Sequence, residues 1–217
     1  MPQKSALLLG ATGLTGGHLL NLLLESEDYH TVYVYSRKPL GIQNSKLKEV
    51  IIDFDTYVGT VEADNVFCCL GTTIKVAKTK EAFKKVDLEY PIKFAQLQFA
   101  AGSKRFLVIS AMGAAEDSFI FYSRVKAEME KLLSNIGYPK LLIFRPALIT
   151  GERKEHRAGE KIAAGINEVL NYVLVGPLKK YQSVSAKAIA SCMISYASNP
   201  QVFGKVVISS DRIKDFE

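Results

Sequence analysis

Three polar residues in the middle of the chain have the types and spacing needed to move a proton to or from a carbonyl oxygen. Ser110 follows the apolar run 106–109, and Tyr122 and Lys126 come later, four residues apart. That spacing places both side chains on one face of a helix. A lysine ammonium beside a tyrosine favours the phenolate, and a serine hydroxyl can donate a hydrogen bond to a substrate oxygen. The set predicts hydride-transfer chemistry with Tyr122 as acid or base.

The Tyr122 and Lys126 pair carries little information by itself, because its spacing is common on helices. The alternative interpretation is that Tyr122 packs at a helix start and Lys126 is a solvated surface residue. Ser110 favours the chemical interpretation, since it ends a predicted strand. In an open α/β sheet that end of a strand faces the ligand crevice.

The elements that must position these residues alternate along the chain between short apolar runs and segments with helical periodicity. This alternation predicts an α/β fold, a doubly wound parallel sheet of Rossmann type with helices on both faces. The expected strands are 6–9, 32–35, 50–52, 66–70, 106–109, 141–144 and 206–208, and the expected helices are 18–25, 80–101, 122–135 and 185–197.

A single domain is expected to cover all 217 residues, a length that one hydrophobic core can serve. The segment 151–183 interrupts the alternation and includes an amphipathic stretch at 159–174. We expect it to form a small C-terminal cap over the carboxyl ends of the strands. It could close the pocket, join a second copy of the chain in a homodimer, or pack against its own domain.

A glycine-rich loop near the start of the chain predicts a dinucleotide site. It follows the first expected strand and opens a leucine-rich helix, which is the context in which such loops bind a pyrophosphate. Free N–H groups at the helix start would hold the phosphates. The alternative is a glycine-rich turn without a ligand. The loop consists of Gly10-Ala11-Thr12-Gly13-Leu14-Thr15-Gly16.

The end of the second expected strand favours NADP(H) over NAD(H). An NAD-preferring domain usually carries an acidic residue there for the ribose 2′-hydroxyl, whereas this chain has Ser36, Arg37 and Lys38. A guanidinium can bind a 2′-phosphate through two hydrogen bonds, and Ser36 and Lys38 could add a hydroxyl and a second charge. The alternative is that Arg37 and Lys38 are ordinary exposed charges in a turn.

Later strand ends supply further candidate contacts to the cofactor. Asp53 and Phe54 end the third expected strand, where Asp53 could accept from the adenine amino group and Phe54 could cover the ring. A simple strand-end carboxylate is the alternative for Asp53. At the fourth strand's end, Leu70, Gly71 and Thr72 would bring the backbone close to the cofactor's ribose.

The composition excludes several classes of protein. The net charge is +6, but basic and acidic residues are mixed, which argues against a nucleic-acid partner. A basic site for a phosphorylated ligand is the second interpretation of this charge. No apolar run is long enough to predict membrane insertion, and the apolar start is too short for a signal peptide.

The three cysteines form no pattern typical of a disulfide framework or of a metal site. Cys68 and Cys69 lie in an apolar run, and Cys192 stands alone. We expect buried free thiols, no bound metal and a cytoplasmic location.

The glycine-rich loop, Ser110 and Tyr122-x-x-x-Lys126 together resemble the short-chain dehydrogenase/reductase superfamily in its atypical or extended branch. Four further motifs resemble the Tat-interacting-protein-like oxidoreductases. These motifs are Cys69-Leu70-Gly71-Thr72-Thr73, Ser110-Ala111-Met112-Gly113-Ala114, Lys126-Ala127-Glu128-Met129-Glu130 and Arg145-Pro146-Ala147-Leu148-Ile149-Thr150-Gly151.

The resemblance implies NADPH binding and catalysis by Ser110, Tyr122 and Lys126, with Lys126 also holding the nicotinamide ribose. It further implies that Arg145 and Pro146 run past the nicotinamide end of the cofactor.

One residue departs from the family pattern. Asp87 stands where many relatives carry an asparagine that completes a proton relay. The family also includes cofactor-binding regulators. Two functions therefore stay open: an NADPH-dependent carbonyl reductase or alcohol dehydrogenase, and an NADPH-binding sensor with little or no turnover. Epimerase or dehydratase chemistry is a third alternative, which the short C-terminal part disfavours.

Overall fold

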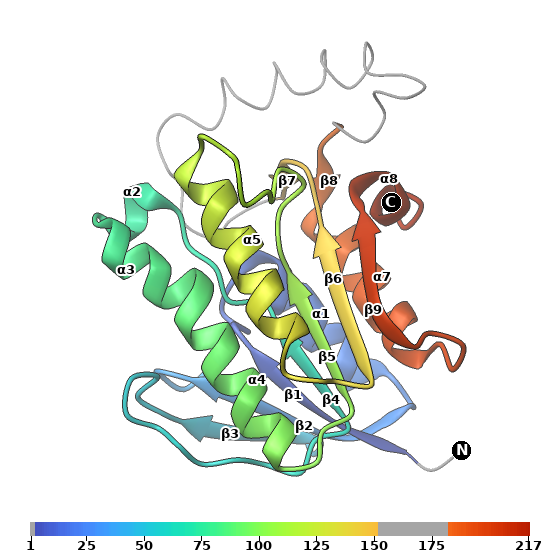
Figure 1. Cartoon of the computed structure of the whole chain (residues 1–217). Helices are drawn as coiled ribbons and strands as arrows, with labels where there is room; N and C mark the ends of the chain where they lie inside the picture. Colours follow the sequence, from blue (N-terminus) through green and yellow to red (C-terminus); the bar gives the residue numbers. More distant parts are fainter. Residues whose placement is uncertain (1–2, 152–181) are drawn as a thin grey trace.

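A computed structural model of the chain describes residues 3–151 and 182–217 (Figure 1). Its centre is a seven-stranded sheet in which every pair of neighbours is parallel. The strand order is β3-β2-β1-β4-β5-β6-β9. The strands are β1 (Lys4–Leu9), β2 (Tyr29–Ser36), β3 (Leu47–Ile51), β4 (Asn65–Cys68), β5 (Arg105–Ile109), β6 (Lys140–Arg145) and β9 (Gly204–Ser209).

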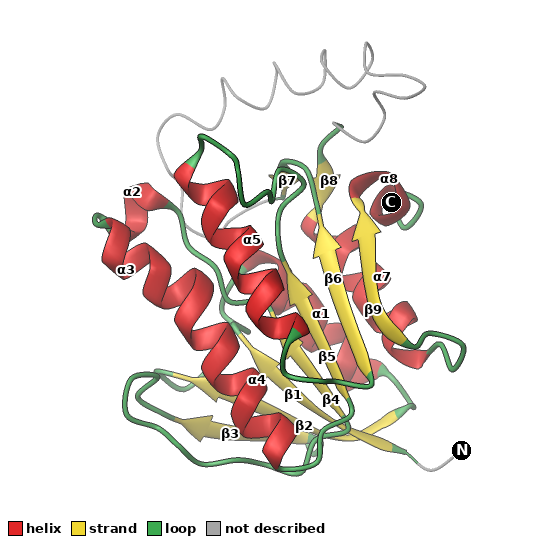
Figure 2. Ribbon diagram, viewed as in Figure 1, coloured by secondary structure: helices red, strands yellow, loops and turns green. Residues whose placement is uncertain are grey.

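Helices cover both faces of this sheet (Figures 1 and 2). The helices α1 (Leu14–Glu25), α7 (Ala186–Ser198) and α8 (Ser210–Lys214) pack on one face. The other face carries α3 (Lys80–Lys84), a π-helical turn η1 (Lys85–Glu89), α4 (Tyr90–Ala100) and α5 (Phe121–Ser134). A short helix, α2 (Ile74–Ala77), precedes α3. The predicted doubly wound α/β fold is confirmed.

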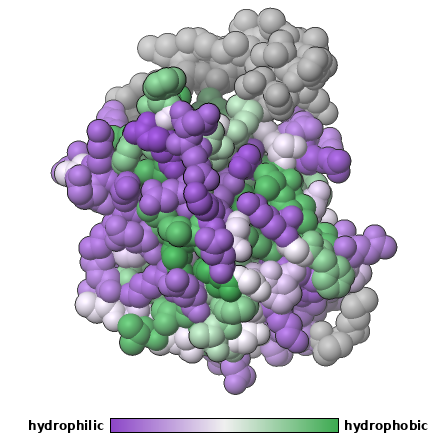
Figure 3. All heavy atoms as spheres, in the orientation of Figure 1, coloured by the Kyte–Doolittle hydropathy of each residue, from purple (hydrophilic) through white to green (hydrophobic). Residues whose placement is uncertain are grey.

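The core lies in two layers, one on each side of the sheet. Leu7 and Leu8 are neighbours in β1, both are fully buried, and they point into different layers. Because both faces of a parallel strand are covered, its sequence is a continuous apolar run rather than an alternating one. The helices expose their polar sides, and hydrophilic residues dominate the surface over α3 and α5 in Figure 3.

The expected helix at 80–101 differs from the structure in one respect. A π-helical turn, η1, interrupts it, and the backbone N–H of Tyr90 bonds to the carbonyl of Lys85, five residues back. This wider turn buries both Asp87 and Leu88. Such π-turns are frequent at functional sites.

Most of the expected cap, residues 152–181, lies outside the described residues. Its two ends are joined by a small parallel sheet of β7 (Ile149–Thr150) and β8 (Val184–Ser185). This pairing brings both ends of the segment to the carboxyl side of the main sheet.

Candidate functional site

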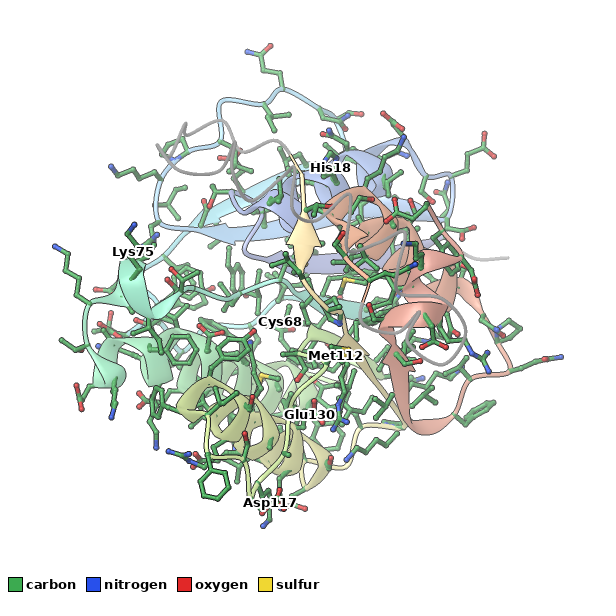
Figure 4. All side chains as sticks on the ribbon, turned by 90° about the horizontal axis from the view of Figure 1, so that it is seen from above. His18, Cys68, Lys75, Met112, Asp117 and Glu130 are labelled. Atoms are coloured by element: carbon green, nitrogen blue, oxygen red, sulfur yellow. The ribbon has the colours of Figure 1, made fainter. Side chains whose placement is uncertain are left out.

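The candidate site lies at the carboxyl ends of the parallel strands. The strand order reverses between β1 and β4, and open α/β sheets bind ligands outside the strands at such a point. Figure 4 views this side of the sheet. Cys68 of β4, Met112 after β5 and Glu130 of α5 are labelled in the middle of that view, whereas Lys75 and Asp117 lie at its edge.

The glycine-rich loop is built around close backbone contacts. Gly10 has a positive φ of 86°, and a Cβ atom there would lie 2.7 Å from the carbonyl oxygen of Cys69. A Cβ atom at Gly16 would lie 2.1 Å from the carbonyl oxygen of Gly10. The chain can make this turn and start α1 against it because neither position carries a side chain.

The start of α1 presents backbone N–H groups that no side chain caps. Gly13 precedes the helix and has no capping side chain, and its own N–H donates to the carbonyl of Gly10 at 3.0 Å. Thr12 and Gly13 are exposed, whereas Thr15 is buried under the loop. Leu14 lies against Gly151, where an added Cβ would meet its side chain at 3.2 Å. The uncapped helix start fits a dinucleotide's phosphates.

The end of β2 presents two exposed cations. Arg37 and Lys38 are both exposed, but Ser36 is buried and its hydroxyl donates to the carbonyl of Lys38 at 2.9 Å. The Ser36 proton is therefore used within the turn, and Arg37 and Lys38 are the groups that can reach a ligand.

The structure corrects one part of the expected adenine site. Phe54 is buried, and its ring packs 5.4 Å from the ring of Tyr90 and 5.3 Å from that of Phe94. Its ring is therefore packed in the core, and it does not present a free platform for a base. Asp53 is exposed, and its Oδ1 accepts the N–H of Asp55 at 2.8 Å.

The loop after β4 is held to η1 by a single carboxylate. The N–H of Thr72 donates to Oδ2 of Asp87 at 2.8 Å. Gly71 beside it is exposed, and a Cβ there would lie 3.5 Å from Oδ1 of Asp87. Leu70 is half-buried. The segment that is expected to approach the cofactor's ribose is thus fixed by Asp87.

Lys126 is buried and forms an ion pair with the same carboxylate. Its Nζ lies 2.7 Å from Oδ1 of Asp87, and both side chains are at most 3% exposed. Burial alone would lower the pKa of Lys126, but Asp87 and then Tyr122 outweigh it, and the pKa lies above its usual value. Lys126 is therefore charged at neutral pH and is not a solvated surface residue.

Tyr122 lies one helical turn before Lys126, with the lysine Nζ 6.0 Å from the centre of its ring. Burial raises the pKa of Tyr122, Lys126 lowers it and Asp87 raises it, and the net result is a pKa above the usual value. The expected effect of Lys126 is thus present but outweighed. Tyr122 is a neutral phenol at neutral pH.

Ser110 belongs to a second buried network, which the sequence motifs did not predict. Its hydroxyl lies 2.5 Å from Oε1 of Glu130, and Ser110 itself is 2% exposed. Arg145 donates to both oxygens of Glu130, at 2.9 and 2.5 Å. A signal was present in the sequence, because Tyr122, Lys126 and Glu130 are spaced four residues apart on α5.

Pro146 is buried after β6, and its carbonyl accepts the N–H of Met112 at 3.0 Å.

Burial raises the pKa of Cys68 to about 12 and that of Cys69 well above its usual value. Neither thiol is a nucleophile at neutral pH, and the described residues contain no cluster of His, Cys, Asp or Glu that could hold a metal ion.

The comparisons with known proteins agree with this geometry. A family model described as NAD(P)H-binding matches residues 10–200 of the chain. The chain belongs to this NAD(P)H-binding family. The match begins at Gly10 of the glycine-rich loop and includes Ser110, Tyr122 and Lys126.

Relatives of this NAD(P)H-binding protein include animal and fungal chains. A protein from Rattus norvegicus named HTATIP2 is 35% identical over 170 residues, which is 75% of this chain and 70% of that protein. A protein from Candida albicans named FMP52, mitochondrial, is 30% identical over 216 residues, 94% of this chain and 93% of its own. The resemblance to the Tat-interacting-protein-like group is confirmed.

Solved structures share the fold at low sequence identity. MoeE5 in complex with UDP-glucose and NAD aligns with a TM-score of 0.70 and 18% identity, over 96% of this chain and 79% of that one. UDP-glucose 4-epimerase from Thermotoga maritima aligns with a TM-score of 0.68 and 16% identity, over 98% and 80% of the two chains. The NAD(P)H-binding chain therefore has the extended short-chain dehydrogenase/reductase fold.

The expectation of a cytoplasmic protein is wrong. Relatives from several fungi, among them Debaryomyces hansenii and Candida albicans, are named mitochondrial. The expectation rested on free thiols, but the Cys68 and Cys192 thiols are buried and are shielded from oxidants in any compartment. Among the described residues, no helix combines the length and apolar character needed to cross a membrane.

The close contacts of the glycine-rich loop lead to a first prediction. Gly16→Ala should lower the free energy of unfolding by about 2 kcal/mol and weaken binding of the nicotinamide cofactor, because its Cβ would overlap the Gly10 carbonyl. Gly17→Ala is the matched control, since a Cβ there meets nothing closer than 3.6 Å. The control should gain at most about 1 kcal/mol. Urea denaturation and NADPH fluorescence titration measure both effects, and equal behaviour of the two variants would contradict the loop geometry.

The Glu130 network leads to a second prediction. Glu130→Ala should lower the free energy of unfolding by about 2–3 kcal/mol, because it leaves Ser110 and Arg145 without their shared acceptor. Glu128→Ala, two residues earlier on α5, removes an exposed carboxylate 3.6 Å from Lys84 and should cost under about 1 kcal/mol. Chemical denaturation of both variants measures the difference, and similar costs would show that the network does not stabilise the fold.

Proposed function

We propose that this protein is an NADPH-dependent oxidoreductase that transfers hydride to or from a small carbonyl or alcohol substrate. The observation that carries the proposal is the placement of Tyr122 and the buried Lys126 on α5, with Ser110 at the end of β5. This set lies at the carboxyl edge of the sheet, beside a glycine-rich loop whose contacts exclude side chains.

In this proposal Tyr122 transfers the proton. Its pKa is raised by burial, more than Lys126 lowers it, so the phenol holds its proton at neutral pH. It then donates that proton from Oη to the carbonyl oxygen of the substrate and regains one from water. When bound, NADPH would supply the hydride for the carbonyl carbon. In the reverse direction Tyr122 must first lose its proton.

The exposed end of β2 supports NADPH over NADH. Arg37 and Lys38 are exposed there, and Ser36 is buried with its proton used in the turn. No acidic residue occupies this strand end to bind a ribose 2′-hydroxyl. A 2′-phosphate would meet two cations at this position, whereas a 2′-hydroxyl would leave them without a charged partner.

A regulatory function is the second candidate, because two of the three proposed catalytic groups already have buried partners. Ser110 donates to Glu130, and Lys126 is paired with Asp87. A site whose Ser110 and Lys126 are held by these partners could bind NADPH, and the binding could change those contacts without any substrate being turned over. Screening the purified protein with NADPH and varied carbonyls discriminates, since robust turnover would exclude regulation as the main role.

The cofactor proposal predicts a selective effect at the end of β2. Arg37→Ala should raise the Kd for NADPH roughly 10- to 100-fold, because it removes charge-assisted hydrogen bonds to the 2′-phosphate. The Kd for NADH should change less than about twofold. Calorimetric titration with both cofactors measures this. Arg212→Ala on α8, an exposed arginine beside the opposite edge strand, is the control. NADH binding equal to or tighter than NADPH binding in the unmodified protein would overturn the preference.

The catalytic proposal predicts that Tyr122→Phe reduces kcat by at least about 100-fold, because the phenol proton is lost while the ring's packing remains. NADPH affinity should be nearly unchanged. Tyr33→Phe on β2 is the matched control and should retain activity. Steady-state kinetics and cofactor titration measure the two properties, and turnover that survives Tyr122→Phe would rule out this mechanism.

A further inference from the structure

Asp87 joins three parts of the site through its two oxygens. Oδ1 pairs with Lys126 of α5 at 2.7 Å, and Oδ2 accepts the N–H of Thr72 from the loop after β4 at 2.8 Å. Asp87 itself belongs to η1 and is 1% exposed. An asparagine could accept from Thr72 in the same way, but it would not neutralise the lysine.

The ion pair changes what Tyr122 experiences. An isolated ammonium 6.0 Å from the centre of the Tyr122 ring would stabilise a phenolate. With a carboxylate 2.7 Å from that ammonium, the two charges form a compact dipole. The effect of a dipole falls with distance more steeply than that of a single charge. Asp87 therefore offsets part of the stabilisation of the phenolate by Lys126, and burial raises the pKa of Tyr122 further.

Other groups near Lys126 and Tyr122 do not restore a positive field. From β4, the Cys68 thiol is neutral, because burial raises its pKa to about 12. From β5, the carbonyl of Ile109 accepts from Lys126 at 3.5 Å. From α3, Phe83 offers an apolar ring 5.7 Å from that of Tyr122.

Two charges nearer the other end of α5 cancel each other. Glu130 follows Lys126 by one turn, and Arg145 of β6 pairs with it through two hydrogen bonds. The Glu130 carboxylate also accepts from Ser110. Among the described charged groups that face this cluster, Asp87 is therefore the one that sets the balance around Lys126.

We propose that Asp87 sets the pH range of the reaction: by offsetting part of the Lys126 charge it adds to the effect of burial in keeping Tyr122 a phenol, so that carbonyl reduction stays active to higher pH and alcohol oxidation begins only at higher pH. This inference rests on the proposed function. Asp87 acts as a positioning residue, since it works through Lys126 and Thr72. Reduction uses the proton that Tyr122 already holds, whereas oxidation requires its removal before the substrate's hydroxyl proton can be accepted.

The inference can be tested on Tyr122 itself, without turnover. The full chain carrying ¹³Cζ-labelled tyrosine is titrated by NMR, and the Tyr122 signal is assigned by its loss in Tyr122→Phe. Asp87→Asn keeps the shape and an acceptor for Thr72 but removes the negative charge. We expect the Tyr122 midpoint to fall by about one pH unit or more. An unchanged or higher midpoint would overturn the inference.

Glu128→Gln is the matched control, because it removes an exposed carboxylate of α5 that pairs with Lys84 at 3.6 Å. Solvent screens that charge, and the Tyr122 midpoint should move by less than about 0.3 units. A shift as large as that of Asp87→Asn would show that the effect is not specific to the buried pair, and would overturn the inference.

A double variant covers the case in which Asp87→Asn fails to fold with an unpaired buried lysine. Asp87→Asn/Lys126→Gln removes both charges and leaves neither ion unpaired. If the pair is a near-neutral unit, the Tyr122 midpoint of the double variant stays within about half a unit of the unmodified protein. A rise of more than about one unit would show that Lys126 acts as an unbalanced cation, and would contradict the inference.

Kinetics separate this inference from the proposed function. If the protein turns over, Asp87→Asn should extend alcohol oxidation to lower pH by the same shift that the NMR titration shows. An oxidation profile that does not move would count against the inference. If no carbonyl or alcohol is turned over at all, the proposed function fails, while the Tyr122 midpoints still decide whether Asp87 offsets Lys126.

Discussion

The arrangement of the site depends on the cost of burying charge at the carboxyl edge of the sheet. Lys126 is held there with almost no exposed surface, so an unpaired ammonium would be strongly destabilising. Asp87 supplies the counter-charge from η1 and also fixes the loop after β4 through Thr72. One carboxylate thus ties α5, the π-turn and the loop that is expected to approach the cofactor's ribose.

The same constraint acts again one turn further along α5. Glu130 is buried, and it accepts from Ser110 of the loop after β5 and from Arg145 at the end of β6. The two networks are independent in their partners but share one helix face. Together they connect the ends of the central strands, so the positions of the candidate catalytic groups are set by charge pairing as well as by apolar packing.

Local patterns were enough to predict the seven strands, the main helices and the glycine-rich loop. Buried parallel strands read as apolar runs, and Gly10 and Gly16 mark contacts that exclude any side chain. The patterns could not show that the expected helix at 80–101 contains a π-turn, because the contacts of Asp87 are with residues distant in the sequence. The patterns also did not predict that the Phe54 ring is buried, and the free cysteines did not indicate the compartment.

The sequence by itself determined the fold, the glycine-rich loop of a nicotinamide-cofactor-binding family and the spacing of Ser110, Tyr122 and Lys126, because these follow from periodicity and from glycine contacts within short segments. Only the tertiary structure decided which charges meet. Asp87 and Lys126 are far apart in the chain, as are Ser110, Glu130 and Arg145, yet each group is brought within hydrogen-bond distance. The pKa of Tyr122 depends on its burial and on the Lys126 and Asp87 charges beside it, since an electrostatic effect is set by distance in space and by burial rather than by position in the chain.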